Sequence, residues 1–360
     1  MTTSFLKNAL IIPVAALSLS GLVLAQEEST TPSTPRFVVL PAKPSTDSAQ
    51  PAVTLATWNG SFVYSGHTYS YNMVGTAPSS NASTTIPVYI IPVKIVITSK
   101  TGTKTTFDPA HVLTNGKTVI QNTVDSPIFD STTTYVQGGV NVGTTQYIDA
   151  YQRANFWGTV SGNKNYHVLF GAPTVLAEQT LSPPAADGKT GPEFGFTAGK
   201  VNINWLDAKF QTMLKKFTQI QPNALPIFVL YDTYLTQGTC CIGGYHSAAG
   251  AQAYAQFTYA DHVGAFSQDV SALSHEAGEF VDDPLVNNAS GNPVSCGILE
   301  VGDPLEGNVN YGAYPYTVNG FMYNLQDLVT LPYFGAPPST SVNNWFTFQG
   351  ESETVCANGG

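Results

Sequence analysis

The chain has 360 residues, 42% of them hydrophobic, so it is long and apolar enough to bury a substantial core. Only 11% of the residues are charged, and 14 Lys plus Arg against 24 Asp plus Glu give a formal net charge of −10. So few basic residues cannot form the positive patch that nucleic acid or an anionic membrane surface requires. We expect neither as a partner.

The first 25 residues have the pattern of a secretory signal peptide. Lys7 precedes an apolar run over residues 9–24, and VLA at 23–25 offers small residues for cleavage before Gln26. The run is short for a permanent membrane span, and an uncleaved anchor is the alternative. No later stretch holds about 18 consecutive apolar residues. We therefore expect a secreted mature protein outside the membrane.

The next segments predict a linker followed by one domain. Residues 26–52 are rich in Pro, Ser and Thr and predict a solvated linker with one short strand at RFVVL (36–40). Residues 53–356 are expected to form a single domain. Its N-terminal half is expected to be mainly β, because short β-type runs such as IPVYIIPVKIVIT alternate with Thr, Gly and Asn turns. One helix is expected near 145–156.

The C-terminal half changes to a mixed pattern. Helical spacing of apolar residues predicts a helix over 201–218, capped by Asn204. PIFVLYD (226–232) and QAYAQFTYA (252–260) predict buried strands, with the intervening TQGTCCIGGYHSAAGA as a loop. QDVSALSHEAGEFV (268–281) then predicts a second long helix, and the whole layout is of the α+β class.

The second helix carries a His-Glu-x-x-Glu motif. At about 100° per residue, His275 and Glu279 share one stripe, while Phe280 and Val281 lie on an apolar back. Side chains one turn apart can converge on one metal ion. Glu276 lies about 100° round the helix, which suits a general base that takes a proton from a metal-activated water without binding the metal. A solvated polar helix face is the alternative.

The order helix, strand, loop, strand, HExxE helix resembles zincin-type metallopeptidases. That resemblance implies a mixed β-sheet with a backing helix at 201–218, and an edge strand at 252–260 lining the substrate cleft. His246, in the loop before that strand, could face the cleft and bind substrate, or be an ordinary loop histidine. The gluzincin group closes its site with a later Glu, and Glu300 is the matching candidate. Asp303 is the alternative ligand, and simple turn carboxylates are the other explanation for both.

One His and two carboxylates would make an anionic metal site. Zinc is the expected ion, and other divalent ions such as Mn²⁺, Fe²⁺ and Ca²⁺ fit the same donors. Negative ligands weaken the ion as a Lewis acid, so we expect slower hydrolysis than in an enzyme with two His on the helix.

Four cysteines are available for disulfides in an exported chain. Neighbouring Cys240 and Cys241 rarely bond to each other, so we expect each to pair with a distant partner, Cys296 or Cys356. The sequence does not choose among the possible pairings.

Several segments together resemble the plant EXORDIUM / phosphate-induced protein family and related secreted bacterial proteins. They are CCIGGYHSA (240–248), LSHEAGEFVDDPLVN (273–287), EVGD (300–303) and VNGFMYNLQDL (318–328). The family often has Cys directly after the third of these segments, where this chain has Pro304, so the family's disulfide pairing cannot be copied. The plant members are apoplastic proteins linked to growth, so the resemblance implies a secreted protein.

The sequence therefore predicts a secreted zincin-like metallohydrolase, a peptidase acting on a peptide or protein substrate. His275, Glu279 and Glu300 would hold the ion, and Glu276 would be the general base. The alternative is a non-catalytic secreted or cell-wall-associated protein that retains the fold and a structural metal.

Overall fold

A computed structural model describes most of the chain after residue 36. The described residues are 37–38, 40–44, 53–288, 299–305 and 313–350. The signal peptide predicted at 1–25 lies outside them, as do Cys296 and Cys356. Contacts join residues 34–360 into one unit, and the fold below is that unit.

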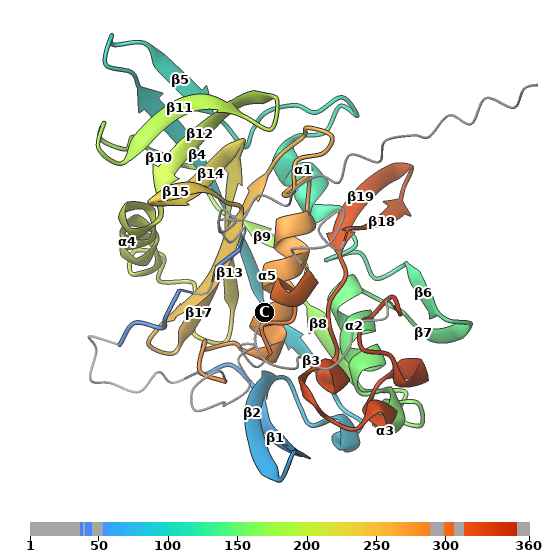
Figure 1. Cartoon of the computed structure of the whole chain (residues 1–360). Coiled ribbons are helices and arrows are strands. Elements are labelled where there is room, and N and C mark those ends of the chain that lie inside the picture. Colours follow the sequence, from blue (N-terminus) through green and yellow to red (C-terminus); the bar gives the residue numbers. More distant parts are fainter. Residues whose placement is uncertain (1–36, 39, 45–52, 289–298, 306–312, 351–360) are drawn as a thin grey trace, which may run out of the picture. The chain divides into compact units, whose positions relative to one another are not determined.

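A seven-stranded sheet lies at the centre of this unit (Figure 1). Three long strands, β4 (Val88–Thr98), β13 (Leu225–Tyr231) and β17 (Gln252–Tyr259), run parallel to one another. The sequences of β4 and β13 are near-continuous apolar runs, as expected for strands covered on both faces. β16 (Gly244–Ala249) pairs antiparallel with β17 and ends the strand order on that side. Three shorter strands pair with β4: β5 (Lys104–Phe107), β9 (Thr174–Val175) and β10 (Gln179–Leu181).

Two helices cover opposite faces of the sheet: α4 (Ile203–Leu214) and α5 (Ser271–Asp282). Successive residues of a strand point to opposite faces, so alternate side chains of β13 belong to different cores. Ile227 packs in the core that contains the apolar side of α5, whereas Phe228 packs in the core of α4. The predicted backing helix and motif helix are therefore both present.

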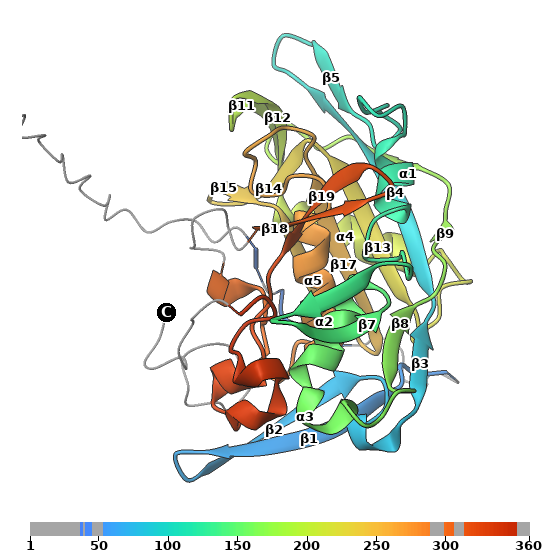
Figure 2. The same ribbon diagram turned by 90° about the vertical axis from the view of Figure 1, so that its right-hand side faces the viewer.

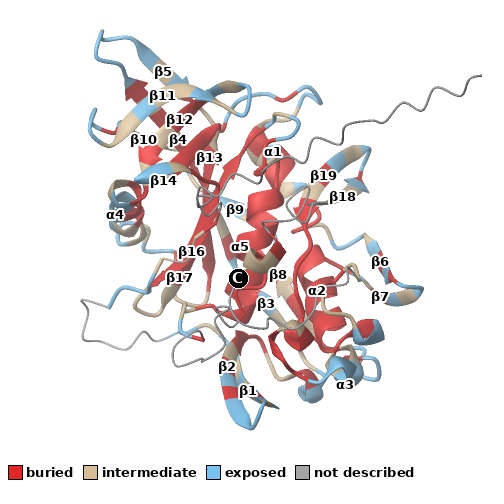
Figure 3. Ribbon diagram, viewed as in Figure 1, coloured by how far each residue is buried: buried red, intermediate tan, exposed pale blue. Residues whose placement is uncertain are grey.

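Helix α5 is buried along its whole length (Figure 3). It contacts β16, β17, β2 (His67–Val74), β19 (Phe321–Gln326) and α2 (Tyr147–Asn155). Figure 2 shows it enclosed between the central sheet and the hairpin that β19 forms with β18 (Ala313–Val318). A buried helix that carries several acidic residues must satisfy them from its neighbours, because unpaired buried charges are costly. The acidic residues of the motif helix therefore lie inside the protein.

The remaining elements complete a strand-rich, mixed α+β fold with open sheets, with five α-helices among the described residues. A four-stranded sheet contains β11 (Gly188–Glu193), β12 (Phe196–Asn202), β14 (Thr233–Gln237) and β15 (Thr239–Ile242). The smaller pairs contain β1 (Thr57–Tyr64) with β2, β3 (Ser83–Ile86) with β8 (His167–Phe170), β6 (Thr134–Gln137) with β7 (Val140–Thr144), and β18 (Ala313–Val318) with β19. The shorter helices are α1 (Val119–Val124), α3 (Trp157–Val160) and the 3-10 turns Pro78–Ser80, Asp303–Leu305, Leu331–Phe334, Pro338–Thr340 and Val342–Asn344. No helix in the described ranges is long and apolar enough to cross a membrane.

Three predictions about the C-terminal half were wrong in detail. The loop expected at 236–251 instead forms β15 and β16. The strand 252–260, expected at the sheet edge, is β17 and lies between β13 and β16, so β16 takes the edge. Asn202, rather than Asn204, caps α4, because its side chain accepts from the backbone N–H of Trp205 at 3.1 Å.

Part of the expected linker is packed against the fold. Phe37 is only 2% exposed and forms a parallel bridge with Gly244, and Lys43 forms one with Ala249. The described residues of this segment therefore lie along the outer edge of β16, instead of being solvated throughout.

Candidate metal centre

The motif helix brings its predicted ligands together. His275 Nε2 lies 2.9 Å from Glu279 Oε1, one turn away on α5, and both side chains are buried. Glu276, next to His275, is fully buried and neither of its carboxylate oxygens has a hydrogen-bond partner. The side chains of the motif thus converge inside the protein as the helical projection predicts.

A second imidazole joins them from the sheet. His246 lies on β16, and its Nδ1 is 3.3 Å from Glu279 Oε2 and 3.5 Å from Glu276 Oε2. From the sequence we expected His246 in a loop, where it would either bind substrate or have no functional role. On the strand it is 1% exposed and faces the acidic side of α5.

The segment after α5 supplies two more carboxylates. Glu300 is 4% exposed, and one of its oxygens lies within 4.8 Å of ligand atoms of His246 and Glu279. Asp303, at the start of a 3-10 turn, places Oδ1 3.3 Å from His275 Nε2, and its side chain is 39% exposed. Both predicted candidates reach the site, but Glu300 is grouped with His246, while Asp303 makes the contact with His275. We refer to the five buried residues as the α5 cluster: His246, His275, Glu276, Glu279 and Glu300.

Hydrogen bonds fix which imidazole nitrogens are free. His246 Nε2 lies 3.2 Å from the backbone carbonyl oxygen of Asp283, which can only accept, so Nε2 donates. His275 Nδ1 lies 2.9 Å from Gln326 Oε1, and the amide nitrogen of Gln326 donates to the carbonyl of Gly302. Nδ1 of His275 therefore donates as well. This is the way in which proteins orient metal-binding histidines, and it leaves one nitrogen of each ring facing Glu279.

Those two nitrogens have no aligned hydrogen bond. His246 Nδ1 and His275 Nε2 are buried without a hydrogen-bond partner, although each lies within 3.3 Å of a carboxylate oxygen of Glu279. Both carboxylate oxygens of Glu300 are also without a partner. Donors bound to zinc at about 2.1 Å in tetrahedral geometry lie about 3.4 Å apart. The spacing and the unsatisfied atoms both fit a divalent cation at Glu279.

Burial and charge act against each other in the α5 cluster. Burial raises the pKa of Glu276 to about 7, and it raises the pKa of Glu300 well above its usual range. At Glu279 burial acts in the same direction, but the imidazoles of His275 and His246 outweigh it and hold its pKa well below the usual range. Carboxyl groups with such raised pKa values hold protons near neutral pH, and a divalent cation would displace them.

Two glycines let the backbone approach these side chains. A Cβ atom on Gly302 would lie 2.3 Å from His275 Nδ1, and one on Gly244 would lie 2.6 Å from Glu276 Oε1. Neither position has room for a larger residue without displacing a member of the α5 cluster. The ring of Phe37 covers the other side, stacked on the His275 imidazole at 3.9 Å between centroids.

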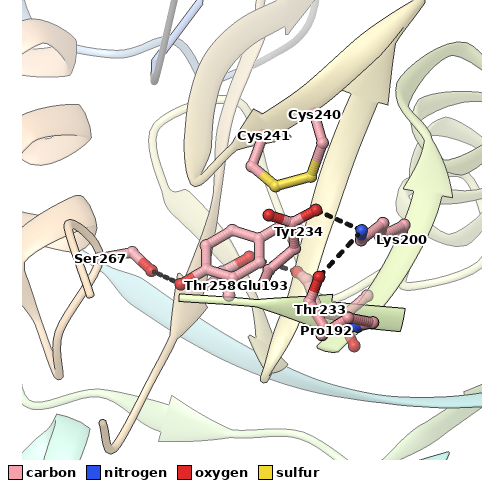
Figure 4. Close-up of a disulfide and its surroundings, with 9 residues drawn as sticks. All are labelled: Pro192, Glu193, Lys200, Thr233, Tyr234, Cys240, Cys241, Thr258 and Ser267. Carbon is pink, nitrogen blue, oxygen red and sulfur yellow. Dashed lines mark hydrogen bonds and ion pairs between the residues drawn. A yellow bond between two sulfur atoms is a disulfide. The ribbon is translucent and has the colours of Figure 1, made fainter. Parts of the chain in front are cut away.

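The expectation for the cysteines was wrong. Cys240 and Cys241 form a disulfide with each other (Figure 4). A trans peptide holds consecutive Cα atoms about 3.8 Å apart, whereas the cis peptide here brings them to 3.0 Å. Their sulfur atoms lie near Glu193, which pairs with Lys200 on the neighbouring strand.

No protein-family model, curated protein or solved structure matches this chain. The resemblance to the EXORDIUM family therefore stays a prediction from the sequence, and so does the zincin-like description of the fold.

Proposed function

We propose that the chain is a secreted, zincin-like metal-dependent hydrolase that acts on peptides. The observation that carries the proposal is a pair of buried imidazole nitrogens facing one carboxylate, Glu279, without an aligned hydrogen bond. The proposed ligands are His246, His275, Glu279 and Glu300. His246 and Glu300 are grouped with Glu279, His275 approaches the other oxygen of Glu279, and the four side chains would draw together on the ion. The sequence indicated one imidazole and two carboxylates. The second imidazole makes the donor set softer and favours zinc over calcium or magnesium.

A bound divalent cation would polarise a carbonyl oxygen and lower the pKa of water toward 7. The chain's own residues would handle the proton. Glu276 has two unsatisfied oxygens beside His246, and burial brings its pKa to about 7, near the value that suits a general base at neutral pH. It would accept a proton from the attacking water and deliver it to the departing amine. The half-exposed Asp303 lies where the cluster meets solvent.

The proposed location has separate support. A disulfide between Cys240 and Cys241 is compatible with an oxidising compartment, where such bonds persist.

The test combines metal content with hydrolysis of a fluorogenic peptide mixture. Glu276→Gln is expected to keep the metal and to lose roughly 100- to 10,000-fold in kcat/KM, the usual effect of removing a general base. Glu178→Gln, a partly buried glutamate that pairs with Lys94, is the matched control and should behave as wild type.

Three results would separate the possibilities. A wild-type chain without stoichiometric metal would refute the proposal. Metal with full hydrolysis in Glu276→Gln would remove Glu276 as the base. Metal without hydrolysis, both in wild type and in a chain opened by Phe37→Ala, would favour the non-catalytic alternative with a structural ion.

A further inference from the structure

The outer edge of β16 is occupied by the chain's own N-terminal segment, residues 37–44. The backbone N–H of Lys43 donates to Ala248 O at 2.8 Å, and Gly250 N–H donates to Lys43 O at 2.8 Å. Ser247 Oγ donates to the carbonyl of Leu40 at 2.9 Å. A strand edge offers unpaired N–H and C=O groups, and an extended peptide can use them to add a strand. The segment has docked in this way.

Its side chains are anchored on both faces of the sheet. On the α5 side, Phe37 stacks on His275 and meets the ring of Phe266 edge-on at 5.6 Å. On the α4 side, the Lys43 ammonium forms a close ion pair with Asp207, a fully buried carboxylate. An aromatic residue and a basic residue six positions later therefore fix the segment at its two ends.

The described part of the segment, residues 37–38 and 40–44, pairs less continuously than the neighbouring strand. Among these residues bridges form at Phe37 and Lys43, whereas β16 pairs with β17 residue by residue over its whole length. Pro41 and Pro44 have no N–H to donate, and residues 41–44 are exposed. A strand held in this way can be exchanged for another chain of the same chemistry.

We propose that the β16 edge beside α5 is a binding site for an extended polypeptide, and that residues 37–44 are its resident occupant. The preferred ligand carries a large aromatic side chain over His275 and a basic side chain on Asp207, six residues further along. Phe37 of the occupant covers His275 of the α5 cluster, so displacing the occupant would give another peptide access to this side of the cluster. This last consequence rests on the proposed hydrolase function, whereas the binding itself does not.

The binding test uses full-length chains and a fluorescent peptide with the sequence of residues 36–44, RFVVLPAKP. The Phe37→Ala/Lys43→Ala chain frees both anchors and is expected to bind the peptide about 10- to 100-fold more tightly than wild type, whose own segment competes. Replacing Phe by Ala in the peptide should remove about the same factor. Lys104→Ala, at an exposed lysine on β5, is the matched control and should bind as wild type.

Circular dichroism shows whether the double variant folds. If it does not, Lys43→Ala alone serves, because the Lys43 side chain is 47% exposed, and a smaller gain in peptide binding is expected. A folded variant that binds the peptide no better than wild type overturns the inference. Equal affinity for the peptides with Phe and with Ala at this position overturns it as well.

A parallel hydrolysis assay keeps the two proposals apart. Peptide binding without metal or hydrolysis would refute the proposed function and leave the binding site standing. Hydrolysis by a variant that fails to bind the peptide would refute the binding site and leave the function standing.

Discussion

Two groups of His and carboxylate side chains in this protein have similar composition and different surroundings. The second group, which we call the His262 cluster, contains Asp232, Asp261 and His262 near the ends of β13 and β17. Its His262 side chain is 37% exposed and forms a hydrogen bond at 3.1 Å with Asp232. Members of the α5 cluster are at most 4% exposed. Residue types alone therefore do not identify a metal centre.

What separates the clusters is how their ring nitrogens are satisfied. His262 has a hydrogen bond, access to water and a stacking partner, Phe196, at 3.7 Å. His246 and His275 each use one nitrogen to anchor the ring and have no aligned partner for the other. Water can satisfy the first arrangement, whereas a cation fits the second.

Removing the proposed cation is the strongest way to break the comparison. A ligand present at about 1,000 times its dissociation constant stabilises a protein by about 4 kcal/mol, so EDTA should lower the Tm of wild type by roughly 10 °C. Calorimetry should find the same drop in His262→Ala and none in Glu279→Gln, which has no cation to lose. If EDTA lowered the Tm of Glu279→Gln but not that of His262→Ala, the His262 cluster rather than the α5 cluster would be the cation site.

Asp269, outside both clusters, tests whether burial alone raises the pKa of a carboxyl group in this fold. Burial raises its pKa to about 7, although hydrogen bonds from Asn324 and Val270 act in the other direction. An unfolded Asp titrates near 3.9, so this carboxyl contributes stability below that pH and loses it as pH rises through about 7. Across this window wild type should lose about 1.4 kcal/mol per pH unit relative to Asp269→Asn. Urea unfolding at several pH values would measure the difference, and parallel profiles would contradict it.

Gly302→Ala tests the α5 cluster without replacing any of the proposed metal ligands. The added Cβ would meet His275 Nδ1 at 2.3 Å and push the ring away from Gln326. Disturbing such an outer contact typically weakens metal binding by about 10- to 100-fold. Competition with a chromophoric chelator measures the affinity. Gly191→Ala, whose Cβ would meet only Lys200 at 3.6 Å and beyond, is the matched control. Equal affinities in both variants would show that His275 does not bind the ion.

The smallest effect is expected at Asp261. Its contact with His262 is a partly exposed ion pair, so Asp261→Asn should change the free energy of unfolding by about 0.5 kcal/mol or less and leave metal content unaltered. Glu300→Gln, in the α5 cluster, should lower metal affinity. Matching metal losses in the two variants would remove the distinction between the clusters.

Local periodicity was sufficient to predict the motif helix. The spacing of His275, Glu276 and Glu279 against an apolar back sets which side chains meet on α5, and the structure has ligand atoms of all three within 4.8 Å of one another. The resemblance to the gluzincin group, rather than the helix spacing, led to the candidates Glu300 and Asp303, and it did not show which imidazole each would approach. That depends on the path of a chain segment with no periodic pattern.

Tertiary placement accounts for what the sequence did not reveal. His246 belongs to the α5 cluster only because β16 lies beside α5. Residues 244–249, GYHSAA, show no alternation of polar and apolar side chains that would have predicted a strand. Phe37 sits in a Pro- and Ser-rich stretch that is typical of a linker, and its burial depends on the unpaired edge of β16. Cys240 and Cys241 were predicted to have distant partners because neighbouring cysteines rarely bond to each other, whereas the structure joins them.

Metal content of the purified chain after exhaustive dialysis tests the central claim most directly. His246 is the deciding residue, since only the folded structure puts it beside Glu279. We predict about one equivalent of zinc in wild type and in His67→Ala, an exposed histidine on β2, and roughly a tenth or less in His246→Ala. Metal-free wild type, or a full equivalent retained in His246→Ala, would contradict this account of the α5 cluster.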